Sequence, residues 1–184
     1  LFESIIDLIN YDNIEGQPLC NSDMLLQALQ GSSPVDNHYW QELKVLKHLC
    51  LLRNDEPSGV IAYGIRKDNT GVILWSHSRE DSTVTDILIS EALTALKDCE
   101  KIEAFSHASS LSMGLEGLPS SRKTTDSVLL KHSFESEDSW LYMNREISPQ
   151  DKIVIARNTA GDGIQIIEAE GNDLKNHRYF TLRL

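Results

Sequence analysis

The chain has 184 residues, of which 40% are hydrophobic and 24% charged, as in ordinary soluble globular proteins. A formal net charge of −11 argues against a general nucleic-acid binder, because neutralising phosphates takes clustered Lys and Arg. No apolar run approaches the roughly 20 residues that span a bilayer, so we expect no membrane segment.

The three cysteines are unevenly spaced and form no CxxC pair. Cys50 and Cys99 lie in apolar segments, so we expect buried thiols in a reducing compartment rather than a disulfide or a metal site. The six histidines show no HxH, HxxxH or HExxH spacing, and we predict no metal site. These features favour a cytoplasmic location, but the chain opens on Leu1 without a methionine, which leaves export open.

The first 30 residues are predicted to be helical. Apolar side chains recur at helical spacing in LFESIIDLIN, and again in SDMLLQAL after a candidate N-cap at Ser22. GSSPVDN (31–37) indicates a loop. From Lys47 the period becomes that of strands, since HLCLLR, GVIAYGIR and GVILWSH are separated by the turn-rich NDEPS and KDNTG. The pattern predicts a three-stranded antiparallel meander.

A strand–helix–strand unit is predicted next. An amphipathic helix spans about 84–98, and KIEAFSH (101–107) is strand-like. So short a return favours parallel pairing of the strands before and after the helix, through a right-handed crossover. Residues 108–122 indicate a loop, and 124–132 a short helix capped by Thr or Asp.

The C-terminal part is rich in strand-like runs. SWLYMNREI (139–147) is one predicted strand, and KIVIAR, GIQIIEAE and HRYFTLRL are three more, or a hairpin plus one. We therefore expect an α/β domain with a mixed sheet over 1–147 and a β-rich extension over 148–184. The extension either completes the sheet, covers an acceptor site, builds a homodimer or begins a second domain.

Two segments of the predicted domain resemble the GCN5-related N-acetyltransferase (GNAT) superfamily. VILWSHSREDSTVTDIL is similar to the family's strand, turn and helix, and VLLKHSFESEDSWLYMNRE to its closing helix, turn and final strand. The resemblance covers about 1–147 and implies a GNAT-like fold: a mostly antiparallel sheet flanked by helices, with splayed parallel strands four and five. It also implies acyl-CoA in the splay, its pantetheine paired with strand backbone and its pyrophosphate on the amides of the following loop.

Carried over by position, the cofactor-binding residues are Leu74, Trp75, Ser76, Arg79, Ser82, Thr83, Val84 and Thr85. Arg79 stands at the family's Arg/Gln position. Ser82 and Val84 replace two glycines that let the backbone approach the pyrophosphate closely. Glu80 and Asp81 add negative charge beside that phosphate and repel it.

Candidates for the chemistry border the same splay. His77 and His107 end the two splayed strands, where either is a candidate general base. Glu103 is a candidate for binding the acceptor amine or relaying its proton. Leu129 stands where many family members carry a tyrosine acid, and Tyr142 is a candidate substitute. The alternatives are surface histidines, a solvated glutamate and a packed tyrosine.

Two further cations, Arg122 and Lys123, precede the short helix at 124–132. They are candidates to contact the adenosine phosphates of the cofactor, and a solvated helix start is the alternative.

The sequence leaves two functions. The first is an acetyl-CoA-dependent N-acetyltransferase that acts on a small amine or peptide amine by direct attack in a ternary complex. The second is a GNAT-fold ligand-binding or interaction module that has lost the cofactor. The charged turn, Val84 and Leu129 favour the second, whereas the frequency of enzymes in the family favours the first, which is the function we expect. The decision rests on whether amides between Trp75 and Ile87 converge on an anion-sized hollow beside a gap between strands.

Overall fold

The computed structural model describes residues 1–13, 18–30, 43–106, 111, 117–136, 165–168 and 180–183. The chain divides into two compact units, Leu1–Leu141 and Tyr142–Leu184. In the second unit, β5 (Gln165–Glu168) pairs antiparallel with β6 (Phe180–Arg183), which confirms strands in two of the predicted tail segments. The predicted strands KIVIAR and SWLYMNREI lie outside the described residues.

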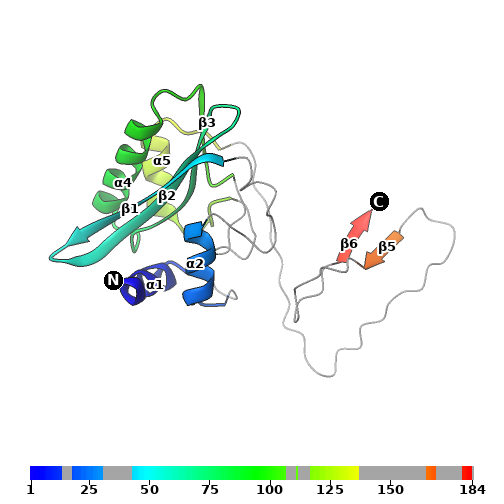
Figure 1. Ribbon diagram of the computed structural model, residues 1–184, viewed down its shortest axis with the longest axis horizontal. Coiled ribbons are helices and arrows are strands. Elements are labelled where there is room, and N and C mark those ends of the chain that lie inside the picture. Colours follow the sequence, from blue (N-terminus) through cyan, green and yellow to red (C-terminus); the bar gives the residue numbers. More distant parts are fainter. Residues whose placement is uncertain are drawn as a thin grey trace. The chain divides into compact units, whose positions relative to one another are not determined.

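A four-stranded mixed sheet forms the centre of the first unit (Figure 1). Its order is β1 (Leu43–Arg53), β2 (Glu56–Arg66), β3 (Thr70–His77) and β4 (Lys101–Ala104). The first three strands are an antiparallel meander, and β4 pairs parallel with β3. Asn54 and Asp55 both have positive φ, as a tight two-residue hairpin turn with the right twist requires. The predicted meander and parallel pair are confirmed.

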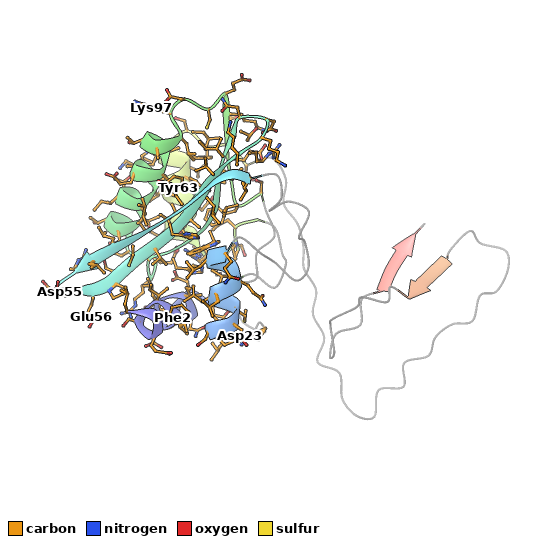
Figure 2. All side chains as sticks on the ribbon, in the orientation of Figure 1. Phe2, Asp23, Asp55, Glu56, Tyr63 and Lys97 are labelled. Atoms are coloured by element: carbon orange, nitrogen blue, oxygen red, sulfur yellow. The ribbon has the colours of Figure 1, made fainter. Side chains whose placement is uncertain are left out.

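Helices cover both faces of this sheet (Figure 1). On one face, α4 (Ser82–Leu96) and α5 (Lys123–Lys131) bury a core with Ile61, Tyr63 and Ile73 of the strands. On the other, α1 (Phe2–Tyr11) and α2 (Ser22–Gln30) pack on the opposite side chains of the same strands. Figure 2 shows side chains filling the space on both sides of the sheet. The fold-class prediction is confirmed.

Close packing sets the position of α4 on the sheet. A Cβ added at Gly59 of β2 would lie 2.4 Å from Val84 Cγ1 and 2.8 Å from Leu88 Cδ1. Only a glycine therefore lets the first turns of α4 come this near to β2. Val84 is held in this contact and is 1% exposed, so its side chain is tightly packed.

Both predicted helix caps differ from the structure. Asn21, not Ser22, caps α2, since its Oδ1 accepts from Met24 N at 3.0 Å. The cap of α5 is not a local Thr or Asp but Glu80, whose Oε2 accepts from Thr124 N at 2.7 Å. Sequence spacing finds only local caps, whereas this carboxylate arrives through tertiary contact from the loop between β3 and α4.

The prediction of buried thiols is wrong for Cys50, which is exposed. It lies on β1, an edge strand of the described sheet whose side chains are only partly covered. Cys99 is half-buried, and Cys20 is buried, which raises the pKa of its thiol to about 11. All three are free thiols.

Candidate functional site

Strands β3 and β4 stop pairing where the resemblance implies that its parallel strands four and five splay apart. Phe105 N donates to Ile73 O at 2.8 Å, and the positive φ of Phe105, 58°, then turns the chain away. Beyond Ile73, β3 continues to His77 without β4 beside it. The Arg122 guanidinium enters here, and its Nη2 donates to the Ser76 carbonyl at 2.9 Å. A charged side chain of the protein thus pairs with strand backbone where the resemblance implies pantetheine.

The loop after β3 has only four residues, Ser78 to Asp81, and makes a sharp turn without glycine. Arg79 and Glu80 adopt left-handed φ values of 54° and 52°. The first two loop amides point at Asp12: its Oδ2 accepts from Ser78 N at 3.1 Å and Arg79 N at 3.3 Å. Asp81 N donates to Ser78 O at 3.0 Å.

The N-terminus of α4 is also closed by a carboxylate of the chain. Asp81 is its N-cap, and Oδ1 accepts from Thr83 N at 3.0 Å and Val84 N at 3.2 Å. The Asp81 carbonyl accepts from Thr85 N at 2.9 Å. We call the amides of Ser78, Arg79, Thr83 and Val84 the anion seat. Every one of them is bound to an aspartate of the protein itself.

A buried ionic cluster lies behind the anion seat. Arg122, whose side chain is 5% exposed, donates from Nε to Glu80 Oε1 at 2.7 Å, and its Nη2 lies 3.5 Å from Asp12 Oδ2. Glu80 Oε1 also accepts from the Thr125 hydroxyl at 2.7 Å. These bonds join the loop after β3, the start of α5 and the end of α1. Such pairing offsets much of the cost of burying these charges.

The ionisation states of the cluster follow from this geometry. Burial opposes a charge on Asp12, yet neighbouring His77, Arg122 and the Ser78 amide hold its pKa below the ordinary value. The pKa of Glu80 is likewise lowered, against burial, by Arg122 and Thr125. Burial is the main cause that lowers the pKa of His77, and the carboxylate of Asp12 opposes it. The cluster therefore holds two carboxylates, one guanidinium and a neutral imidazole at neutral pH.

The predicted cofactor-binding residues are dispersed by this arrangement. Leu74 and Trp75 are buried under α1 and α2, and Ser76 and Thr85 are buried near Arg122 and Ser78 respectively. Arg79 turns its guanidinium over the Tyr11 ring, 5.7 Å from the centroid. Of the eight, only Ser82 and Thr83 line a hollow described below.

The predicted catalytic residues are not brought together within the described residues. His77 Nδ1 lies 3.5 Å from Asp12 Oδ2, with 12% of the side chain exposed. Glu103 is on β4 and pairs with Lys101 at 2.9 Å and Arg66 at 3.4 Å. Burial raises the pKa of Glu103, but Lys101 and Ser106 hold it below the ordinary value. A carboxylate with a lowered pKa is a weak base. Tyr142 and His107 lie outside the described residues.

A shallow hollow of about 630 Å³ opens between α4 and α5. It is lined by hydroxyls, two lysines, one aspartate and one valine: Ser82, Thr83, Asp86, Lys123, Thr124, Ser127, Val128 and Lys131. No residue of β3 or β4 lines it, so it is not a wedge between the splayed strands. Lys131 is paired with Asp86 at 2.9 Å, which halves the positive charge that the hollow offers an anion.

Sequence reasoning missed Asp12, which receives more backbone amides of the loop than any position it had singled out. The only available signal was that YDN follows the first amphipathic helix, a pattern shared by many helix ends. Among the described residues, no group of His, Cys, Asp and Glu is arranged to hold a metal ion. Nor does any described helix have the length and apolarity to cross a membrane.

Comparisons with known proteins identify no family for the chain. No family model matches the chain, and no curated protein matches it. One solved structure aligns with the chain: the apo form of an aminoglycoside antibiotic 6'-N-acetyltransferase from Acinetobacter haemolyticus. The identity is 13%, 70% of this chain and 97% of that chain are covered, and the TM-score is 0.39. The strand order, parallel last pair and two-sided helices are those expected from the resemblance.

Acid is expected to destabilise the domain through two partly buried imidazoles. The folded-state pKa values of His77 and His48 are lowered, chiefly by burial, from an ordinary value of 6.5. Below about that pH the unfolded chain binds protons that the folded chain does not. The free energy of unfolding therefore falls with decreasing pH, by up to about 1.4 kcal/mol per pH unit for each histidine.

Urea unfolding at pH 7, 6 and 5 measures this dependence. His77→Gln removes one of the two histidines with a lowered pKa and is expected to flatten the profile. His132→Gln removes a half-buried histidine at the C-cap of α5, 2.8 Å from Asp86, and serves as comparison. An unchanged slope in His77→Gln would show that His77 is not buried as a neutral side chain.

Proposed function

We propose that this GNAT-like domain is a non-catalytic binding or interaction module that does not hold acetyl-CoA in the anion seat. The observation that carries the proposal is the occupation of the seat by carboxylates of the chain. Asp12 binds the amides of Ser78 and Arg79, and Asp81 those of Thr83 and Val84. A diphosphate would find no free donor among these four amides.

Electrostatics supports the same proposal. A diphosphate placed here would lie within several ångströms of Asp12, Glu80 and Asp81. At 4 Å each like-charge pair costs about 1 kcal/mol in water and about 4 kcal/mol near a partly buried surface. Only Arg122 offsets this inside the cluster, and it is already bound to Glu80 and to the Ser76 carbonyl.

The surroundings of the seat support it further. Val84 stands where the resemblance implies a glycine and is packed against Gly59, so its Cβ stays beside the seat. Leu129, at the position implied for a tyrosine acid, is a core residue of α5 with 7% exposure. A leucine has no proton to give a leaving thiolate.

Titration calorimetry and thermal unfolding with acetyl-CoA and CoA test the proposal. We expect no binding heat and a change in melting temperature of less than about 1 °C at millimolar ligand, since a ligand far below its Kd adds almost no stability. Saturable binding at micromolar concentration would overturn it. In that case His77, with Asp12 beside its Nδ1, becomes the described side chain best placed to act as a base.

A further inference from the structure

Asp12, whose carboxylate accepts from the loop amides, lies in an unfavourable position on its own helix. Asp12 is the C-cap residue of α1, where the helix dipole is negative and disfavours a carboxylate. Its side chain is 1% exposed, and Oδ1 is buried with no hydrogen-bond partner. A buried acceptor without a partner weakens the contact.

The other oxygen is surrounded by donors that come from outside α1. Oδ2 accepts from Ser78 N at 3.1 Å and Arg79 N at 3.3 Å, and lies 3.5 Å from Arg122 Nη2. We call these donors the Asp12 nest. Successive backbone amides beside a guanidinium form a concave site that suits an oxyanion. Asp12 thus behaves as a ligand of the nest delivered by the end of α1.

The charges of the cluster show what the nest needs. Asp12 and Glu80 carry two negative charges against the single positive charge of Arg122, and His77 is the neutral group beside them. Glu80 alone balances Arg122. Without the Asp12 carboxylate, the two loop amides are left with no acceptor, in a pocket of balanced charge. One added oxyanion restores the original charge and the original bonds.

From these contacts we propose that Asp12 is a displaceable internal ligand. When the C-terminus of α1 withdraws, the Asp12 nest binds a small oxyanion, a carboxylate or a phosphate. The device is an autoinhibitory contact that couples the docking of α1 to an anion site. This inference rests on the proposed function, because it explains how the seat is kept closed.

Chemical rescue of the full chain tests the inference. In Asp12→Ala the nest is emptied, and sodium formate or inorganic phosphate is added at constant ionic strength against sodium chloride. At formate ten times its Kd, we expect the melting temperature of Asp12→Ala to rise by about 2 to 8 °C more than in chloride. The parent chain and the isosteric Asp12→Asn, whose nests stay filled, are expected to show no such rise.

Amide hydrogen exchange locates the effect. Ser78 and Arg79 amides are expected to exchange faster in Asp12→Ala in chloride and to regain protection in the anion that stabilises the fold. A response to formate alone assigns a carboxylate site, and a response to phosphate assigns a phosphate site; either supports the inference. A folded Asp12→Ala that responds to neither beyond chloride overturns it.

A second variant keeps the test decisive when Asp12→Ala does not fold. If Asp12→Ala is unfolded in chloride, Asp12→Ser is treated in the same way, and recovery of the helical circular dichroism in formate or phosphate supports the inference. Absence of recovery in both anions overturns it. Failure of the proposed function is a separate result, because it appears as acetyl-CoA binding by the unaltered chain.

Discussion

Replacing Arg122 by methionine is expected to lower the free energy of unfolding by about 3 to 5 kcal/mol. Arg122 is 5% exposed and donates to Glu80, the Ser76 carbonyl and Thr125. Its loss leaves the buried Asp12 and the partly buried Glu80 without their cation. The penalty is set by these uncompensated charges, because the aliphatic part of the side chain is kept by methionine.

The matched control is Arg53→Met. Arg53 Nη1 lies 3.5 Å from Asp81 Oδ2, but 59% of the arginine side chain and 39% of the aspartate are exposed. Exposed pairs contribute about 0 to 1 kcal/mol, so this variant should remain close to the parent. Arg122→Lys should fall between, since lysine keeps the charge but cannot reach Glu80 and the Ser76 carbonyl together. Urea unfolding followed by circular dichroism measures all three, and equal losses in both methionine variants would refute a buried cluster.

Truncating Ile89 to alanine is expected to cost about 2 to 5 kcal/mol of stability. Ile89 is fully buried in the core that α4 and α5 share with the sheet. The lost side-chain atoms leave a cavity in this core, and its cost adds to that of the lost burial. The same helix carries its own control two residues earlier, where Ile87 is 41% exposed.

The Ile87→Ala variant should lose less than about 1 kcal/mol, because Ile87 is an exposed residue that buries much less surface than Ile89. Both substitutions raise helix propensity by a similar small amount, so their difference reports burial alone. Thermal and urea unfolding of the two variants measure it. A loss in Ile87→Ala as large as that in Ile89→Ala would mean that α4 packs on the sheet through a different face.

Local patterns were sufficient to predict the sheet. The alternating runs before Asn54 and before Lys67 specified two hairpins, because turn-forming residues interrupt them at both places. The short return from α4 to β4 specified a parallel pair. These features depend on side-chain period and chain length, which a sequence states directly.

The site could be predicted only in part. The sequence located the turn between β3 and α4, and the charges of Glu80 and Asp81 already argued against a phosphate there. It predicted repulsion of a ligand, whereas the structure shows caps: Asp81 on α4 and Glu80 on α5. The roles of the two carboxylates therefore differ from those that the sequence predicted.

What the sequence by itself determined is therefore the order of the elements, the mixed sheet with its parallel last pair and the charge of the turn. Only the tertiary structure decided which groups those charged side chains bind. Asp12, Glu80 and Arg122 are far apart along the chain, and they meet because α1, α5 and the end of β3 pack at one place. Period and spacing report neighbours within an element, whereas the partner of a buried charge is selected by packing between elements.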